Sequence, residues 1–491
     1  MIIHWAPLTL LCGFVLADAA VAQNNIAPVA TNKPAGQVAA TNVVVPGQTN
    51  ITPPAPPITV DPSDVPDETS SLSNLYSRPL VEAPSPPPVI GPNNTGNPLS
   101  ISPIMGMSAL SGPSFPAEQP ILGPGIPLWG PVSIHPLLNY TFLYGRGIVS
   151  APGQADTTAI NTVSPGFILG LGDYWTLEYE PSISVYSSRA FKNTVDQNAI
   201  LRGSSSNEVW ALNFSQSYVK TSDPLIETGQ QTTQQGFATT IEGLHQIGNA
   251  SSIDLSVNQN FRYADLSQGL SDLREWNTMD WYNYQVIQQL AAGIGLTVGY
   301  DNSQPGPDMP FEQLQGRLNF RFRDKLLIVL TGGAEDRQFL GPDEPAMISP
   351  VFMGLLRYQP FDSTIITLQG SRQVTPSLFV NQVEVVTAAQ AGITQVLTPK
   401  LTVELSGSYS TTPFTSIVPG ALPPYYIGAP PVTPLTEVRS DRLISGKIDF
   451  GYKVTSKTLV SIFYTLGEDT TAQANFKYTT SQIGLAVNYR Y

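Results

Sequence analysis

The sequence contains little cysteine, histidine or charge, and each shortage excludes a class of protein. One of the 491 residues is a cysteine, Cys12, and three are histidines, so a disulfide framework, a Cys-based zinc site and a histidine cluster are all excluded. We therefore expect no metal and no cofactor. Charged residues make up 12% of the chain and the net charge is −13. An acidic balance argues against nucleic acid as a partner, because nucleic-acid binding needs a basic face.

The few histidines also argue against an enzyme. Membrane-embedded hydrolases need a histidine beside a serine or aspartate partner. Beyond the first 22 residues only His135 and His245 are available. His135 opens the first predicted strand and His245 ends another just before a short turn, so we expect both to be polar residues at the rim of the fold. No catalytic residues are predicted.

Long hydrophobic runs are absent after residue 22, which excludes membrane-spanning helices. The one apolar run, Leu8–Leu16, is followed by Ala20-Val21-Ala22, a small-x-small pattern that precedes signal-peptide cleavage sites. The segment before this run lacks lysine and arginine, which is unusual for a signal peptide. We interpret residues 1–22 as a secretory signal peptide and expect the protein to be exported.

Residues 23–130 differ in composition from the rest of the chain. Residues 24–130 contain 22 prolines but only two basic residues and three aromatic residues. Such a segment lacks the apolar area and the backbone donors needed for a packed core. We predict a disordered, Pro-rich periplasmic tether, which is either a plain spacer or an arm that binds a periplasmic or cell-envelope partner.

Residues 131–491 show a period of two. In the closing segment SQIGLAVNYRY, apolar or aromatic residues occupy every second position, and the residues between them are polar or small. The same alternation recurs in 253–263, 313–323 and 401–410. It is typical of strands with one apolar and one polar face.

Short turns and longer loops alternate along this region. Eight short turns separate nine predicted hairpins, and the loops that alternate with these turns, such as 301–310, 339–346 and 413–436, are longer and rich in Pro, Gly or Asp. This pattern, with an even strand number, predicts an all-β fold: a transmembrane antiparallel β-barrel of about 18 strands, with 16–18 acceptable, in the bacterial outer membrane. A soluble β-propeller is the alternative, but it needs four short strands per repeat and a buried inner face.

The closing segment resembles those of proteins that the barrel-assembly machinery inserts, which end on an aromatic residue preceded by alternating apolar positions. Val487, Tyr489 and Tyr491 carry this resemblance. Residues 131–491 are similar to β-barrel porins and porin-like barrels often encoded near exopolysaccharide genes, in LLNYTFLYG, TMDWYNYQV, EQLQGRLNFRFRDK and YTTSQIGLAVNYRY. The resemblance implies a porin-like barrel, with outer-membrane lipid and the assembly machinery as partners.

Alternation also predicts which charged side chains line the lumen. A column of arginines opposed by carboxylates would bias a pore towards charged or polar solutes. The predicted channel-lining residues are Asp254, Arg262, Arg317, Arg321, Arg323, Glu404, Lys447 and Asp449. The loop 413–436 is expected at the surface, with an inward-folded constriction as the alternative.

Three functions remain open at this point. The first is a porin-like channel for small polar solutes or saccharides. The second is a non-conducting outer-membrane anchor that acts through its Pro-rich arm. The third is a barrel for exopolysaccharide export.

Overall fold

The computed structural model describes the chain from Gly125 to its last residue, with gaps. The predicted signal peptide and the tether up to residue 124 lie outside the described residues. The described ranges are 125–146, 157–207, 209–222, 231–264, 270–323, 325–340, 346–417, 436–471 and 478–491.

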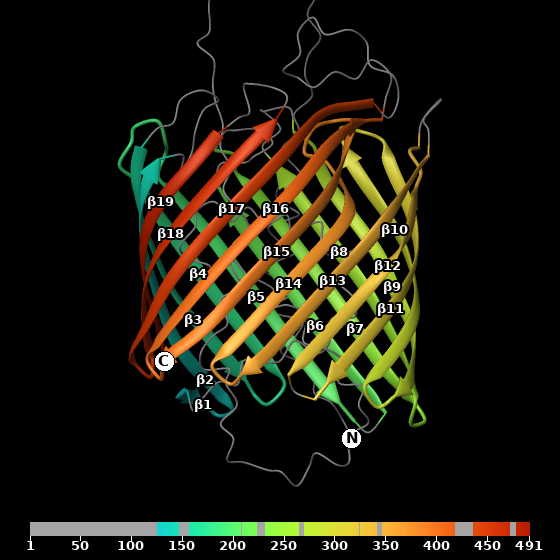
Figure 1. The fold of residues 1–491 in the computed structure, drawn as a ribbon, viewed down its shortest axis with the longest axis horizontal. Helices are drawn as coiled ribbons and strands as arrows, with labels where there is room; N and C mark the ends of the chain where they lie inside the picture. Colours follow the sequence, from blue (N-terminus) through green and yellow to red (C-terminus); the bar gives the residue numbers. More distant parts are fainter. Residues whose placement is uncertain are drawn as a thin grey trace, which may run out of the picture. The chain divides into compact units, whose positions relative to one another are not determined.

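The described residues form one all-β architecture, a closed antiparallel barrel of 18 strands (Figure 1). Each strand pairs with the next, and β19 pairs with β2 to close the ring. The barrel strands are β2 (Val132–Arg146), β3 (Thr157–Leu171), β4 (Trp175–Tyr186), β5 (Thr194–Ser206), β6 (Trp210–Thr221), β7 (Gln234–Ile247), β8 (Ser251–Ala264), β9 (Asp272–Ile287), β10 (Leu290–Gln304), β11 (Asp308–Phe322), β12 (Leu326–Arg337), β13 (Met347–Phe361), β14 (Thr364–Pro376), β15 (Gln382–Thr398), β16 (Leu401–Ser416), β17 (Thr436–Thr455), β18 (Thr458–Thr471) and β19 (Tyr478–Arg490). The predicted strand number is confirmed.

One short strand precedes the barrel. β1 (Ile126–Trp129) pairs with the start of β2, so that Ile126 lies opposite Ile134. Sequence analysis assigned these residues to the tether, because their Pro and Gly content masked a four-residue strand. The barrel sheet therefore begins a few residues before the predicted boundary at 131.

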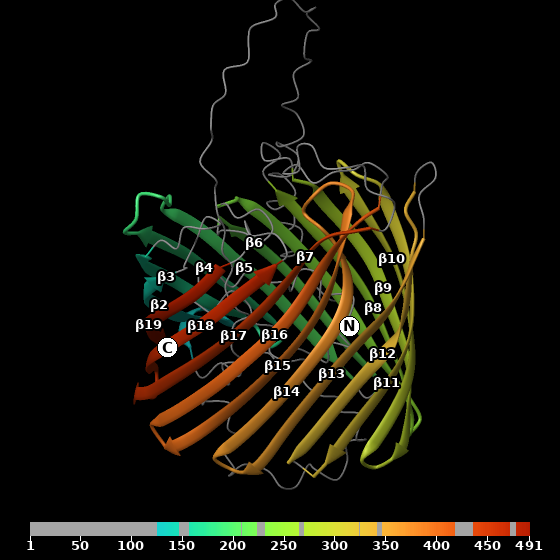
Figure 2. The ribbon, with the colours of Figure 1, turned by 45° about the horizontal axis from the view of Figure 1, so that its top comes forward.

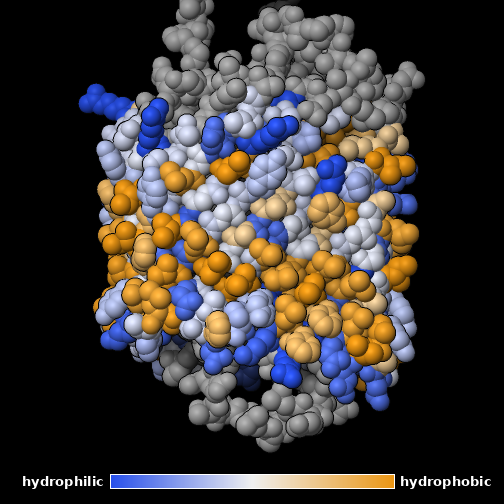
Figure 3. All heavy atoms as spheres, viewed as in Figure 1, coloured by the Kyte–Doolittle hydropathy of each residue, from blue (hydrophilic) through white to orange (hydrophobic). Residues whose placement is uncertain are grey.

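The outer and inner faces of the wall follow the predicted alternation. Apolar side chains such as Leu255, Leu296 and Ile462 are exposed on the outer face, where they form a belt between more polar ends (Figure 3). Polar side chains between them, such as Asn258 and Thr297, are buried on the inner face. This division suits a wall with lipid outside, where every backbone group must be paired within the protein.

The short turns gather at one end of the barrel and the longer connections at the other (Figure 1). By the rule for outer-membrane barrels, the short-turn end is periplasmic. The predicted loop 301–310 is wrong, because β10 continues to Gln304 and β11 starts at Asp308. Its acidic residues Asp301 and Asp308 are therefore strand residues. No helix in the described ranges is long and apolar enough to cross a membrane.

Candidate functional site

The inner wall of the barrel carries an excess of carboxyl groups. Among the described residues, nine carboxyl side chains and three guanidinium groups are buried, although a buried charge is costly unless it is paired or hydrogen-bonded. The carboxylates are Glu178, Glu180, Asp254, Glu275, Asp301, Glu335, Glu404, Asp441 and Asp469, and the guanidinium groups belong to Arg317, Arg337 and Arg439.

One ion network lies towards the periplasmic end. Arg317 on β11 is 3% exposed, and its Nη2 lies 2.8 Å from Oδ2 of Asp254 on β8. The same nitrogen donates to Asn283 on β9, whose own Nδ2 donates to Asp254 at 3.0 Å. The network links β8, β9 and β11 through side-chain hydrogen bonds, and it holds the Arg317 guanidinium against the inner wall.

A second network lies towards the long-loop end, around Arg337 on β12. Its Nε donates to Glu335 at 2.7 Å and its Nη1 to Asp301 on β10. Beside it, Glu275 on β9 accepts hydrogen bonds from Asn277 at 2.7 Å and from Asn260 at 3.3 Å. Carboxylates held in this way keep a fixed position at the lumen wall.

The opposite part of the ring holds the other predicted residues. Glu404 on β16 is buried, and Lys447 on β17 lies 3.1 Å from Asp449 on the same strand. Nearer the loops, Arg439 binds Asp441 at 2.6 Å. Within the described residues, no group of three or more His, Cys, Asp or Glu side chains is placed to hold a metal ion.

Cations on the inner wall also stack on aromatic rings. The Arg317 guanidinium lies 4.4 Å from the ring centre of Trp281, and that ring covers Gly295, where a Cβ would come within 2.6 Å of it. Lys447 lies over Phe463, which covers Gly484 in the same way. The Trp281 ring, which is 2% exposed, thus fills space that the glycine on the next strand leaves open.

Arg321 and Arg323 do not continue a column with Arg317. Arg321 is half-buried near the periplasmic end of β11. Arg323 is exposed in the following turn, with φ of 49°, and its guanidinium lies 5.4 Å from the ring centre of Phe322. The turn reverses the chain before Arg323 could face inward. Of the three arginines of the predicted column, Arg317 is therefore buried and paired, Arg321 is half-buried at the periplasmic end, and Arg323 lies outside the lumen wall.

The wall opens between β13 and β14 at the long-loop end. Their pairing stops at Phe352 opposite Arg372, whereas β12–β13 pairing continues to Met347 and β14–β15 pairing to Pro376. The upper end of β14 therefore separates from β13 and stays paired with β15, which is itself paired with β16 as far as Gln382 opposite Ser416. We call residues 373–385 the inner hairpin.

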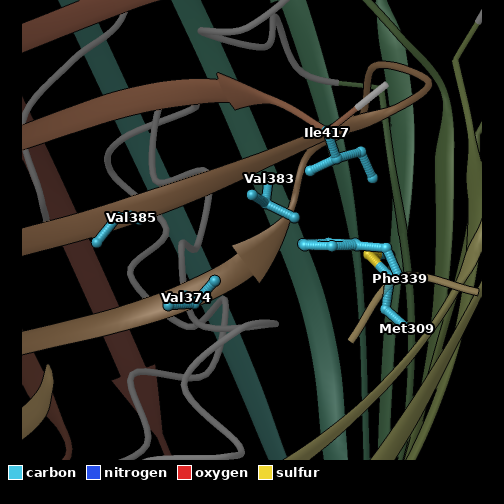
Figure 4. Close-up of a cluster of buried hydrophobic side chains, with 6 residues drawn as sticks. All are labelled: Met309, Phe339, Val374, Val383, Val385 and Ile417. Atoms are coloured by element: carbon cyan, nitrogen blue, oxygen red, sulfur yellow. The ribbon is translucent and has the colours of Figure 1, made fainter. Parts of the chain in front are cut away.

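The inner hairpin is buried inside the barrel. Val374, Val383 and Val385 form one apolar cluster with Met309 and Phe339, which come from the inner side of the β11–β12 wall (Figure 4). Ile417 after β16 completes the cluster, and its N–H donates to Asn381 at 3.2 Å. The hairpin thus packs against wall strands with which it does not pair.

The tip of the inner hairpin reaches β8 and β9. Leu270 and Phe379 form an antiparallel bridge, and Ser271 N–H donates to Leu378 O at 2.8 Å. Arg262, a predicted channel-lining residue, extends its Nη2 to Pro376 O at 3.4 Å and Ser377 O at 3.5 Å. Because β9 and β14 are five strands apart in the ring, this contact crosses part of the lumen (Figure 2).

Sequence analysis missed this constriction. The candidate loop 413–436 lies mostly outside the described residues, and the hairpin between β14 and β15 was treated as ordinary wall. One available signal was the tip sequence SLF at 377–379, because two large apolar residues at the end of a hairpin indicate a buried contact.

The predicted assembly-signal residues lie where the ring closes. Val487 and Tyr489 are opposite Tyr140 and Leu138 of β2. Tyr491 donates its N–H to Pro136 O at 3.0 Å, and Lys457 Nζ lies 3.2 Å from the centre of its ring.

Comparisons with known proteins give low similarity. No family model matches the chain, and no curated protein matches it. OccK11 (OpdR) of Pseudomonas aeruginosa is 11% identical over 73% of this chain and 95% of its own, with a TM-score of 0.36. The outer membrane protein OpdK of the same species is 10% identical over 73% and 98%, at 0.38. A bacterial polysaccharide outer membrane secretin is 8% identical over 72% and 98%, at 0.31. With such scores, the architecture rests on the strand pairing of the chain itself.

Proposed function

We propose that this outer-membrane barrel is a channel for small polar solutes, saccharides among them, with a preference for cations. The observation that carries the proposal is the contrast between the two faces of the wall. The outer face is apolar, whereas the inner face is polar and holds nine buried carboxyl groups against three guanidinium groups in the described residues. Fixed charges of one sign along a pore raise the local concentration of the opposite ion.

The paired arginines do not offset this excess. Arg317, Arg337 and Arg439 each already bind at least one carboxylate. Glu180 accepts a hydrogen bond from Asn139 at 2.7 Å, and Glu275 accepts its bonds from asparagines. These two carboxyl groups are held by amides and not by cations, so they remain part of the carboxyl excess of the inner wall.

The proposal is tested by the reversal potential of the full-length protein in a planar bilayer under a KCl gradient. We expect cation preference, and we expect Glu180→Gln with Glu275→Gln to reduce it while unit conductance persists. Glu312→Gln with Glu468→Gln is the matched control, because both of those carboxylates are exposed on the outer face. Anion preference, or an equal shift in the control, would contradict a selective role for the inner wall.

A folded barrel that conducts nothing would favour the anchor function. In that case deletion of residues 23–124 should abolish the biological role while the barrel itself still assembles.

A further inference from the structure

The upper ends of β13 and β14 are not paired with each other, and no other described strand pairs with the edges that they turn towards one another. Pairing ends at Phe352 opposite Arg372. Extending the same register would place Pro350 opposite Val374 and Ser349 opposite Thr375. On β13 the free edge spans residues 347–351, and Ile348 there is 76% exposed.

We propose that the free edge of β13 is a docking surface for the edge of the inner hairpin, so that the hairpin has two positions. In the inward position, which the structure shows, it narrows the lumen. In the wall position it pairs with β13 and widens the lumen. Only the electrical consequence rests on the proposed channel function.

The alternation of the hairpin suits the wall position. Val374, Val383 and Val385 share one face, and by strand parity this face continues the lipid-facing side of β14 and β15. The other face carries Gln373, Thr375, Gln382 and Glu384, which would face the lumen. One valine face and one polar face are the pattern of a lipid-facing hairpin. The valines that pack on Met309 and Phe339 in the inward position would thus face lipid in the wall position.

Two prolines lower the free-energy cost of separating β14 from β13. The backbone N–H of Gln359 donates to Lys325, directly before β12, and that of Ser377 donates to Gln382 of β15. The N–H groups of odd-numbered residues in β13 and β14 therefore point away from the β13–β14 gap. By alternation, the N–H groups of even-numbered residues point into it. Pro350 and Pro376 are among these even residues and carry no N–H. The wall position would place four backbone hydrogen bonds between β13 and β14 here, but only two can form because the prolines lack donors. In the inward position, the prolines for the same reason leave no N–H group without an acceptor.

The contacts of the inward position are specific but incomplete. In the inward position, Arg262 donates a hydrogen bond to Pro376 O. In the wall position, the N–H of Ile348 would donate to that oxygen instead. The valine face is buried by Met309 and Phe339. Gln373 Oε1, however, is buried without a hydrogen-bond partner in the described structure, which is a cost that the wall position would remove.

Two engineered disulfides in a Cys12→Ser background test the proposal. Ser349→Cys with Thr375→Cys joins residues that are opposite only in the wall position. Leu270→Cys with Phe379→Cys joins residues that form a bridge in the inward position. Disulfide formation under mild oxidation, read by gel mobility and mass spectrometry of the full chain in membranes, does not depend on conduction.

We expect both disulfides to form, each within one chain. The wall disulfide should raise unit conductance, the inward disulfide should lower it, and reduction should reverse both effects. Absence of the wall disulfide in a folded barrel would overturn the proposal. Formation of that disulfide between two chains would also overturn it and assign the β13 edge to a second copy. If both disulfides form in barrels that never conduct, the two positions stand and the channel function fails.

A variant without cysteine gives an independent test. Pro350→Thr with Pro376→Thr restores two ladder donors and should shift the population towards the wall position roughly tenfold or more. This shift should appear as a larger fraction of time at high conductance. Pro310→Thr is the matched control, because Pro310 lies within the paired β10–β11 ladder. No change, or the same change in the control, would contradict the role of the two prolines.

Discussion

At the scale of single residues, the inner wall shows how a buried cation is held in a barrel. Arg317 lies on the face that alternation predicted, yet its contacts are with Asp254 on β8 and with Asn283 and Trp281 on β9. Asp254 lies 63 residues away in sequence, so no local pattern could identify the pair. Glu404, Lys447 and Asp449 also lie on the strand faces that alternation indicates, and Lys447 pairs with Asp449 two residues along the same strand.

Replacing Arg317 should therefore weaken the fold more than it changes selectivity. Arg317→Met leaves Asp254 buried without its cation, and loss of one partner of a buried pair costs about 3–5 kcal/mol. Urea unfolding, followed by the heat-modifiable gel shift, measures this loss. Arg323→Met is the matched control because Arg323 is exposed in its turn. Equal stability of the two variants would show that the Arg317 network contributes nothing.

Gly295 should be needed for the close approach of Trp281. A Cβ at residue 295 would come within 2.6 Å of the ring, whereas at Gly316 on the outer face the nearest atoms are 4.0 Å away. We expect Gly295→Ala to cost about 1–3 kcal/mol through overpacking and Gly316→Ala to cost far less. The temperature at which the folded gel band is lost measures both, and equal losses would contradict the packing account.

At the scale of strands, period-two alternation was sufficient to predict most of the fold. β5 is a full strand although the alternation in its sequence is weak, and the short turn at Gly248-Asn249 lies where β7 ends. The departure of the inner hairpin from the wall was not predictable in this way. Alternation is the same in both positions, and the choice between them depends on Met309, Phe339 and Leu270 from distant strands.

The last strand should determine whether the barrel assembles. Tyr491 lies at the seam between β19 and β2, the pair that closes the ring. If the assembly machinery reads an aromatic terminus, Tyr491→Ala should lower the amount of folded barrel in outer membranes several-fold. Lys457→Ala is the control: it removes the cation from the Tyr491 ring but leaves the aromatic terminus in place. A loss seen only in Tyr491→Ala would therefore come from recognition of the terminus by the assembly machinery and not from the lost ring contact. Wild-type levels of the Tyr491→Ala barrel would contradict this account.

At the scale of the whole molecule, the described strands form one closed ring with an apolar outer face and a polar inner face. Eighteen strands leave room for an aqueous lumen unless something fills it. The inner hairpin occupies part of that room near the long-loop end, and the paired charges along the wall leave the rest polar. The strand number and the direction in which side chains face were predictable, whereas the packing of the inner hairpin inside the barrel depends on contacts with distant strands.

The most direct measurement is the single-channel conductance of the refolded full-length protein in a planar bilayer. The account predicts discrete, steady steps that alternate between a lower level, with the hairpin inward, and a higher level, with the hairpin in the wall. Heat-modifiable, folded protein that inserts and stays silent would contradict the central claim that this barrel is a channel.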